Sequence, residues 1–304
     1  MEVILLGTSA ALPTRLRWPS ATALIREGEV LLFDCGEGAQ IQFQKARLKP
    51  GKLTRIFISH FHGDHFYGLP GLLTSLQLGG REKKLYLYGP KGIAEYIRFM
   101  QKLSHFTLNY EIEIAEVPAA RQQNVWKLDE YKVVAMPLKH RIFTLGFRFE
   151  EKPKPGKFDA IQAKRLKIPW GPVRNLLKSG QQVQLPDGRK ITPSQVVGPK
   201  QAGKIVVFCT DTRPCANAVK LARNADLLIH EGTFAGARQK WADSTGHSTV
   251  LEAAGIAQKA GVKALVLTHI SARYEERDFN PLLNEAQKVF PNTSLGYDFM
   301  KIHV

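Results

Sequence analysis

The sequence has no uninterrupted apolar run that approaches the roughly 20 residues needed to span a bilayer, so we expect no transmembrane helix. Its first residues, Met1–Gly7, form a short apolar segment without the basic start and longer apolar stretch of a signal peptide. Cysteine is scarce as well: Cys35, Cys209 and Cys215 form neither a C-x-x-C pair nor a disulfide framework. An odd number of thiols without an export signal leads us to expect a cytoplasmic protein.

Acidic residues are also few. The chain has 27 Asp and Glu against 43 Lys and Arg, which gives a net charge of +16 and an isoelectric point near 9.8. Such a positive field attracts polyanions, whether nucleic acid, an anionic membrane or acidic substrates. The alternative is a basic surface that serves solubility alone. With 304 residues, 44% of them hydrophobic, the chain is long enough to bury a substantial core.

Short apolar or β-branched segments, separated by Gly, Asp and Pro turns, predict strands in both halves of the chain. The predicted strands are 3–6, 22–25, 30–33, 55–58, 85–88, 131–135, 144–149, 204–209, 226–230 and 262–268. Helices are predicted over 39–45, 68–78, 92–103 and 249–261, the last with Ser248 or Thr249 as its N-cap. Two strand-rich halves suit a sandwich of two sheets.

Between the two halves, residues 150–200 change in composition. Lys152–Lys157 is basic and rich in prolines, and more lysines and arginines follow it. This stretch is predicted to be an insertion rather than part of the core sheets. It is either a loop excursion with solvated charge or an RNA-binding arm, in which Phe158 and Trp170 would meet bases and the cations would meet phosphates.

The segment Ser59–His65 is rich in potential metal ligands. His60, His62, Asp64 and His65 all follow directly after the apolar run Ile56–Ile58. Imidazole and carboxylate are the ligands that Zn²⁺ uses when a catalytic site keeps a position open for water. The alternative is a solvated turn that is rich in histidine. It is disfavoured, since so many desolvated polar groups need a partner.

Three further predicted strands end at a potential ligand. His140 follows the strand near residue 135, Asp211 follows 204–209, and His269 follows 262–268. A lone histidine at a strand end is more often a hydrogen-bonded or exposed residue than a metal ligand. Because four independent strand ends each carry such a residue, the metal-ligand interpretation is favoured here. Together they supply seven groups, enough for two metals that share one carboxylate: His60, His62, Asp64, His65, His140, Asp211 and His269.

The spacing of the histidine cluster resembles the H-x-H-x-D-H signature of the metallo-β-lactamase superfamily. Across almost the whole chain, the motifs further resemble those of the short-form ribonuclease Z family, the tRNA 3′-processing endonucleases. The matching segments are Gly7–Ala10, Asp34–Gly38, His60–His65, His140, Thr210–Arg213, His230–Thr233, His247–Thr249, Thr268–His269 and Ser271–Tyr274.

This resemblance implies an α/β fold, a four-layer αββα sandwich in a single domain over residues 1–304, with an inserted flexible arm at 150–200. It implies two Zn²⁺ per subunit, one held by His60, His62, His140 and Asp211, and the other by Asp64, His65, His269 and the same Asp211. The ions would generate hydroxide at neutral pH, and Asp64 would also accept a proton. The implied reaction cuts precursor tRNA just after the discriminator nucleotide, leaving a tRNA 3′-OH and a trailer 5′-phosphate.

The resemblance also assigns roles around the metals. His247 would protonate the leaving oxygen with Glu231 orienting it, and Arg273 would hold a phosphate. Taken without the family, His247 is equally a residue near a helix start, Glu231 a buried hydrogen-bonding group, and Arg273 an exposed arginine. In the arm, Gly171 and Pro172 match a glycine-proline element of an exosite that holds tRNA and, in a homodimer, serves the opposite subunit.

Asp34 and Glu37 are interpreted as support for the ligand imidazoles rather than as substrate contacts. Two other functions stay open at this point. A small-ester hydrolase of the same superfamily, such as an arylsulfatase or a cyclic-nucleotide phosphodiesterase, keeps every ligand but gives no use to a basic arm. A non-catalytic RNA-binding protein is disfavoured, because the ligand set is intact.

Overall fold

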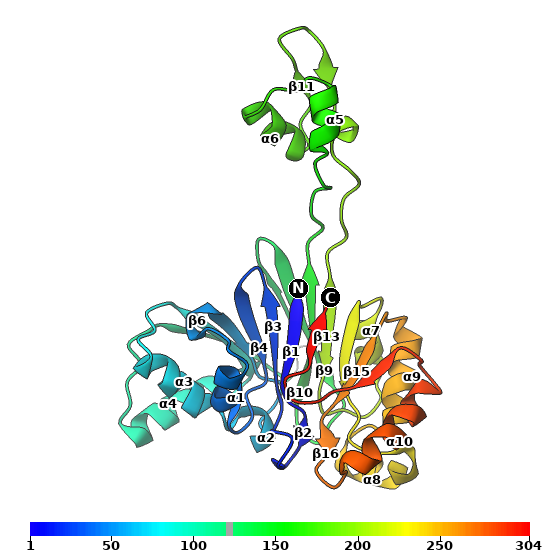
Figure 1. The fold of residues 1–304 in the computed structure, drawn as a ribbon. Coiled ribbons are helices and arrows are strands. Elements are labelled where there is room, and N and C mark those ends of the chain that lie inside the picture. Colours follow the sequence, from blue (N-terminus) through cyan, green and yellow to red (C-terminus); the bar gives the residue numbers. More distant parts are fainter. Residues whose placement is uncertain (120–123) are drawn as a thin grey trace. The chain divides into compact units, whose positions relative to one another are not determined.

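The computed structural model describes residues 1–119 and 124–304 (Figure 1). The chain forms two compact units. The first, called the core unit here, comprises Met1–Lys127, Val133–Phe149 and Ile205–Val304. The second, called the arm unit, comprises Leu128–Lys132 and Glu150–Lys204. Most of the second unit is therefore the stretch whose composition differs from the rest of the chain.

Seven strands form one mixed sheet, with the order β18-β1-β3-β4-β5-β6-β7. These are β1 (Glu2–Gly7), β3 (Ala21–Arg26), β4 (Glu29–Phe33), β5 (Leu53–Phe57), β6 (Leu85–Pro90), β7 (Ile112–Val117) and β18 (Lys301–His303). Strands β4 to β7 run parallel to one another. Because parallel strands share the edge where they end, the residues after β4 and β5 emerge side by side.

A second mixed sheet of seven strands has the order β17-β15-β14-β13-β10-β9-β8. These are β8 (Asn124–Lys127), β9 (Tyr131–Leu138), β10 (Thr144–Glu151), β13 (Ile205–Cys209), β14 (Leu227–Glu231), β15 (Leu265–Thr268) and β17 (Thr293–Leu295). Strands β13, β14, β15 and β17 are parallel. Asp211, Glu231 and His269 thus come to one edge. A short parallel pair of β2 (Ser9–Ala10) and β16 (Ile270–Ser271) lies beside them.

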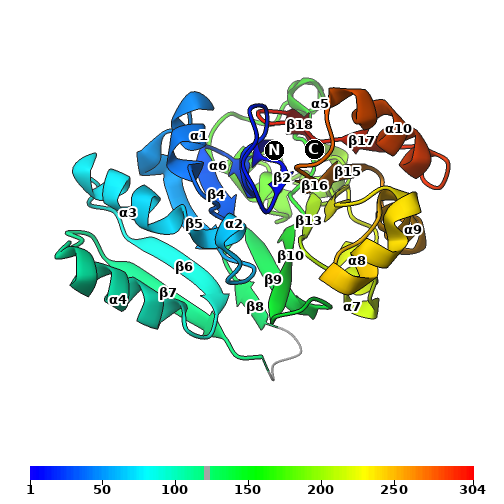
Figure 2. The same cartoon turned by 90° about the horizontal axis from the view of Figure 1, so that it is seen from below.

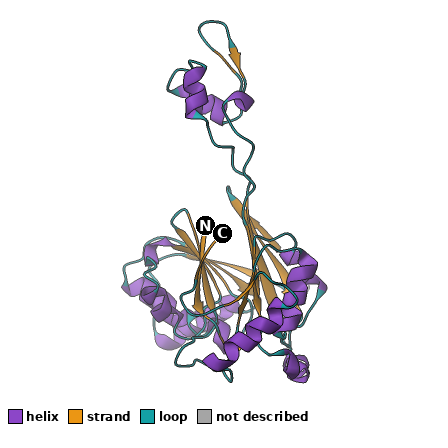
Figure 3. Ribbon diagram, turned by 45° about the vertical axis from the view of Figure 1, so that its right-hand side comes forward, coloured by secondary structure: helices purple, strands orange, loops and turns teal. Residues whose placement is uncertain are grey.

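Helices cover the outer face of each sheet, and the two inner faces pack against each other (Figures 2 and 3). The first sheet carries α1 (Ala39–Lys45), α3 (Leu69–Leu78) and α4 (Ile93–Ser104), and the second carries α7 (Ala216–Ala222), α9 (Val250–Ala260) and α10 (Glu276–Gln287). Between the sheets, the rings of Phe33 and Phe208 stack at 3.8 Å, and Phe57 and Phe147 lie 5.5 Å apart. The predicted αββα sandwich is confirmed.

The predicted helices are confirmed, and their ends have clear physical causes. Helix α9 begins after Thr249, whose hydroxyl accepts a hydrogen bond from the amide of Glu252, and it ends at Gly261 in the left-handed region (φ 64°). That cap also explains one wrong boundary. The strand predicted over 262–268 begins only at Leu265, because residues 261–264 complete the turn out of the helix.

The arm unit has its own small core. It contains α5 (Ala160–Arg165), α6 (Pro172–Lys178), the hairpin of β11 (Val183–Gln184) and β12 (Lys190–Ile191), and a 3₁₀ turn at Pro193–Gln195. The buried side chains are Ala163, Ile168, Leu177, Val183, Leu185, Ile191 and Val196. The two chain segments that lead to this core are paired, since the amides and carbonyls of Lys154 and Gln201 exchange hydrogen bonds of 2.9 and 3.0 Å.

Within the described residues, no helix is both long enough and apolar enough to cross a membrane.

Candidate metal centre

The histidine cluster lies at the edge where β5 ends. After Ile58 the chain leaves the sheet, and His60 and His62 lie in the loop that follows. Asp64 and His65 belong to the single-turn helix α2 (Gly63–Phe66). The tight alternation of loop and helix turns four side chains of one short segment toward the same volume.

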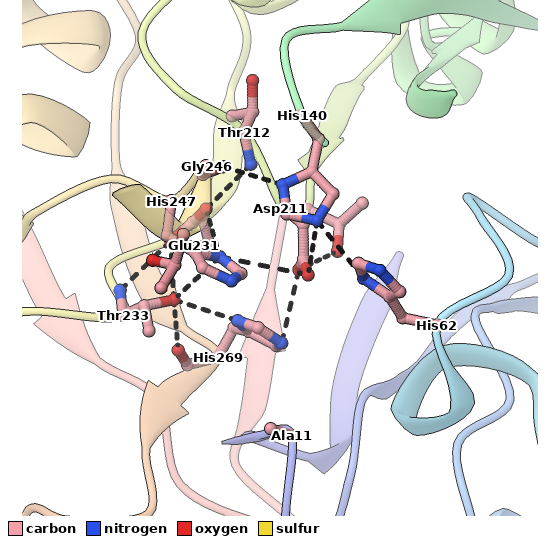
Figure 4. A network of polar contacts seen from close by, with 12 residues as sticks. Ala11, His62, His140, Asp211, Thr212, Glu231, Thr233, Gly246, His247 and His269 are labelled. Atoms are coloured by element: carbon pink, nitrogen blue, oxygen red, sulfur yellow. Dashed lines mark hydrogen bonds and ion pairs between the residues drawn. The ribbon is translucent and has the colours of Figure 1, made fainter. Parts of the chain in front are cut away.

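Four of the predicted ligands form a first group: His60, His62, His140 and Asp211, whose ligand atoms all lie within 4.8 Å of one another. Nδ1 of His62 is 3.1 Å from Nε2 of His60 and 3.3 Å from Nε2 of His140. Oδ2 of Asp211 is 3.4 Å from Nε2 of His60. Figure 4 shows the side chains of His62, His140 and Asp211 converging.

A second group of Asp64, His65 and His269 meets the same distance limit of 4.8 Å. Nε2 of His269 is 3.1 Å from Oδ2 of Asp64 and 3.2 Å from Nε2 of His65. The other oxygen of Asp211, Oδ1, lies 3.2 Å from Nε2 of His65 and 3.3 Å from Nε2 of His269. Asp211 therefore presents one oxygen to each group, as a bridging carboxylate does.

The outer ring nitrogens of His65 and His140 are held by acceptors of the protein. Nδ1 of His65 lies 2.7 Å from a carboxylate oxygen of Asp34, and Nδ1 of His140 lies 2.8 Å from the carbonyl of Gly246. With Nδ1 directed at these acceptors, Nε2 of each ring is the nitrogen that faces the centre and can bind a metal. Imidazole nitrogens from neighbouring rings lie 3.1 to 3.2 Å apart, close enough for both to coordinate one cation. The residues therefore fit a metal-binding centre.

The charge states of the first ligand group are also those that a metal needs. Burial lowers the pKa of His60 to about 4, and burial also lowers the pKa of His62 and His140, so all three rings are neutral ligands at pH 7. Burial alone would raise the pKa of the Asp211 carboxyl, but His269, His65 and His60 around it hold that pKa well below its usual range. Asp211 is therefore ionised.

The backbone is strained on both sides of the centre. Ala11, Asp34 and His269 all have left-handed φ angles, of 60°, 58° and 56°, which cost a residue other than glycine on the order of 1 kcal/mol each. The strained turn at Asp34 lets its carboxylate accept hydrogen bonds from both the amide and the hydroxyl of Ser59, at 2.7 and 2.9 Å. Asp34 therefore fixes His65, as interpreted from the sequence. Ala11 donates its amide to Oδ2 of Asp64 at 2.7 Å.

Glu231 and His247 form an ion pair beside the centre. Nδ1 of His247 is 3.0 Å from Oε1 of Glu231, which is fully buried at the end of β14. Glu231 is held by the amide of Thr212 at 2.8 Å and the hydroxyl of Thr233 at 2.6 Å. Burial lowers the pKa of His247, but the charge and hydrogen bond of Glu231, with the charge of Asp211, outweigh burial and raise it to about 9.

Arg213 holds the backbone of His247 in place. Its guanidinium donates to the backbone carbonyl of His247 at 2.6 Å and to both carboxylate oxygens of Glu252 at 2.6 and 2.7 Å. The hydroxyl of Ser248 donates to the carbonyl of Thr212 at 2.5 Å. The sequence placed Arg213 only within a matching motif. Its bond to His247 joins segments 34 residues apart, so no local pattern could have assigned this role.

A cavity of about 600 Å³ opens onto these groups. His62, Asp64, Asp211, His247 and His269 line it. Arg273 and Glu37 line it as well. The structure thus brings together, in one place, nearly all the side chains that the sequence singled out in the core unit.

Gly171 and Pro172 lie in the arm unit. Gly171 precedes α6 with a φ of 106°, which favours glycine, and Pro172 is the first residue of that helix.

The fold and the paired ligand groups define a metal-dependent hydrolase of the metallo-β-lactamase superfamily. A family model described as a beta-lactamase superfamily domain matches residues 176–270, and one described as anti-Pycsar protein Apyc1 matches residues 1–149. Ribonuclease Z of Acaryochloris marina is 42% identical and that of a Synechococcus strain 45%, each covering all of this chain and 98 and 99% of the relative. The crystal structure of human short-form tRNase Z is 31% identical with a TM-score of 0.74, covering 100% of this chain and 99% of the human one.

The chain belongs to the ribonuclease Z family. The structure of YhfI from Bacillus subtilis, at 20% identity and a TM-score of 0.69 over 99% of this chain and 98% of that one, shares the fold.

Proposed function

We propose that this chain is a zinc-dependent endoribonuclease that removes the 3′ trailer from precursor tRNA directly after the discriminator nucleotide. The products are a tRNA with a 3′-OH and a trailer with a 5′-phosphate. The observation that carries the proposal is that the two ligand groups meet at Asp211 and that members of both groups line one cavity with His247, which pairs with Glu231. The chain bearing them is more than 40% identical, along its full length, to proteins named ribonuclease Z.

Two zinc ions per subunit are the proposed cofactors. His60, His62, His140 and Asp211 would hold one, and Asp64, His65, His269 and the shared Asp211 would hold the other. When bound, the ions act as Lewis acids that polarise the phosphate and lower the pKa of water.

The chain's own residues divide the proton transfers between them. Asp64 orients the attacking water and takes its proton, and the amide of Ala11 keeps one Asp64 oxygen in place. His247, whose pKa is raised to about 9, is charged at neutral pH and donates a proton to the 3′ oxygen that leaves. Glu231 keeps that ring oriented and charged. Arg273, exposed at the cavity, holds a phosphate of the substrate.

The arm unit is proposed as the exosite for tRNA, with Gly171 and Pro172 at the start of α6 among its contacts. Residues 150–204 hold 12 Lys and Arg against four Asp and Glu, and Trp170 is 84% exposed beside the guanidinium of Arg174. Basic side chains that contact phosphates give affinity that does not depend on the RNA sequence, which an enzyme that accepts every tRNA needs. A homodimer and a cytoplasmic location stay predictions from the sequence.

The test is cleavage of a precursor tRNA that carries a 3′ trailer, with zinc and with a chelator, and with the product ends mapped. We expect one cut after the discriminator nucleotide, lost with chelator and restored by zinc. Asp64→Ala should lower turnover by at least about 10²-fold and leave tRNA binding largely intact. Glu82→Ala, which removes an exposed carboxylate, is the control. No cut near the discriminator in the presence of zinc would contradict the proposal.

A further inference from the structure

An aromatic and cationic cluster borders the cavity, and the sequence pattern indicated only its arginine, Arg273. Starting from His247, the ring of Phe234 lies 6.2 Å away at a steep angle, and the ring of Trp241 lies a further 6.3 Å on, again edge to face. The guanidinium of Arg273 lies 4.2 Å from the Trp241 ring and 5.7 Å from the Phe234 ring. Phe234, Trp241 and Arg273 are called the aromatic wall below.

The wall combines a fixed part and an open part. Phe234 is buried after β14 and anchors it, whereas Trp241, in helix α8 (Gln239–Thr245), is 46% exposed. Phe234 and Arg273 line the cavity together with His247 and His269. A half-exposed indole beside two guanidinium groups, since Arg238 lies 5.1 Å from the same ring, presents a flat and positively charged surface next to the reacting groups.

We propose that the aromatic wall binds the base of the discriminator nucleotide by stacking. The inference rests on the proposed function, in which His247 gives its proton to the leaving 3′ oxygen. That oxygen belongs to the ribose of the discriminator nucleotide, so this nucleotide lies on the side of the scissile phosphate where His247 lies. The aromatic wall lies next to His247, because the Phe234 ring is 6.2 Å from the His247 ring. The base attached to that ribose is therefore the base that can contact the wall.

Stacking suits this position chemically. Single-stranded RNA bases stack on aromatic rings and on arginine planes, and every base has a face to offer, so such contacts tolerate sequence. An enzyme that accepts precursors with different discriminator bases needs affinity at this position without hydrogen-bonded selection. The half-exposed ring of Trp241 offers the surface for stacking, the buried ring of Phe234 supports it, and the Arg273 guanidinium adds attraction to both the base and its phosphate.

The experiment compares three precursor tRNAs: the intact one, one with an abasic ribose at the discriminator, and one with an abasic ribose at the first trailer nucleotide. The proteins are the wild type, Trp241→Ala, Trp241→Phe and the control Tyr297→Ala, which removes another exposed aromatic side chain. The value of kcat/KM is measured for each pair.

We expect the abasic discriminator to lower wild-type kcat/KM about tenfold, the scale of one stacked base. Trp241→Ala should lose about the same factor on the intact precursor but less than about twofold more on the abasic-discriminator precursor. Trp241→Phe should keep most of the activity and Tyr297→Ala all of it.

Two results would overturn the inference. In one, Trp241→Ala loses the same factor on all three precursors, which marks a structural role. In the other, sensitivity to Trp241 disappears with the abasic trailer nucleotide instead, which places the trailer on the wall. Neither result touches the proposed function, which fails only if the wild type does not cut the intact precursor after the discriminator.

Discussion

Glu231 is a fully buried carboxylate whose two oxygens accept hydrogen bonds from Thr212, Thr233 and His247. Burial raises the pKa of such a carboxyl, but the charge of His247 and its hydrogen bond outweigh burial and lower it below its ordinary value. The same interaction raises the pKa of His247 to about 9. A buried carboxylate persists only where hydrogen bonds satisfy it, and here three residues supply them to Glu231.

Replacing Glu231 by Gln keeps its size and removes its charge. The imidazolium of His247 then loses its main stabilisation, so its pKa falls from about 9 toward or below the ordinary value of about 6.5. If protonated His247 is the donor, the alkaline limb of the rate profile moves to lower pH by more than about one unit. Single-turnover cleavage of precursor tRNA across the pH range measures this. Glu82→Gln serves as the charge-matched control, and an unmoved alkaline limb in Glu231→Gln would argue against His247 as the donor.

Arg213 is a positioning residue, because it contacts His247 and Glu252 but does not line the cavity. We expect Arg213→Lys to lower kcat about tenfold and leave KM unchanged, since a lysine cannot hold a carboxylate with two parallel bonds while also binding a carbonyl. Steady-state kinetics on precursor tRNA, with Arg98→Lys as control and a melting curve for each protein, provide the test. A rise in KM with constant kcat would assign Arg213 to substrate binding instead.

Among the elements, those with strong local signals were predictable from the sequence. Apolar runs predicted the strands that lead to the centre, and the rule that parallel strands end at one edge explains why Asp211 and His269 meet. Strand β7, with the sequence Ile-Glu-Ile-Ala-Glu-Val, was missed because its acids suit an exposed strand rather than a buried one. Helix α10 was missed as well: it contains Pro281, which breaks most helices.

The metal ligands of the site could be predicted from the sequence. Most of the residues that hold those ligands in place could not. His60, His62 and His140 could be found because each follows a recognisable strand. The amide of Ala11 reaches Asp64 across 53 residues, and Arg273 meets Trp241 only because the turn that holds Arg273 folds against helix α8. Contacts between backbone atoms, and contacts between distant segments, leave no pattern in one sequence.

Removing the arm tests its role as a separate element. Because Lys154 and Gln201 are paired across the two chain segments, a two-residue Asn-Gly turn joining them should close the gap with little strain. We expect cleavage of precursor tRNA to fall by on the order of 10³-fold, the scale of several lost phosphate contacts. Hydrolysis of bis(p-nitrophenyl) phosphate, which is too small to need an exosite, should stay within about twofold. Equal loss of both activities would mean that the arm supports the fold of the core unit instead.

For the whole molecule, the question is whether the net charge of +16 acts as one diffuse field or through one region. Residues 150–204 account for half of it, since their 12 basic and four acidic residues leave an excess of eight. Salt screens a diffuse field over about 10 Å. Phosphates that are contacted directly release counterions, and the salt dependence of binding then counts those contacts.

Two triple variants with equal charge loss distinguish these cases. One replaces Lys164, Arg165 and Lys167 of the arm unit by Gln, and the other replaces the exposed Lys49, Lys52 and Lys83 of the core unit. Both are made in the Asp64→Ala background, and binding of precursor tRNA is measured against salt at fixed pH and zinc. Each lost phosphate contact should reduce the slope of log K against log salt by about 0.7 to 0.9. We therefore expect the arm variant to lose roughly two units of slope and the core variant almost none. Equal losses would show that tRNA is attracted by the charge of the whole molecule, and the arm would then be no exosite.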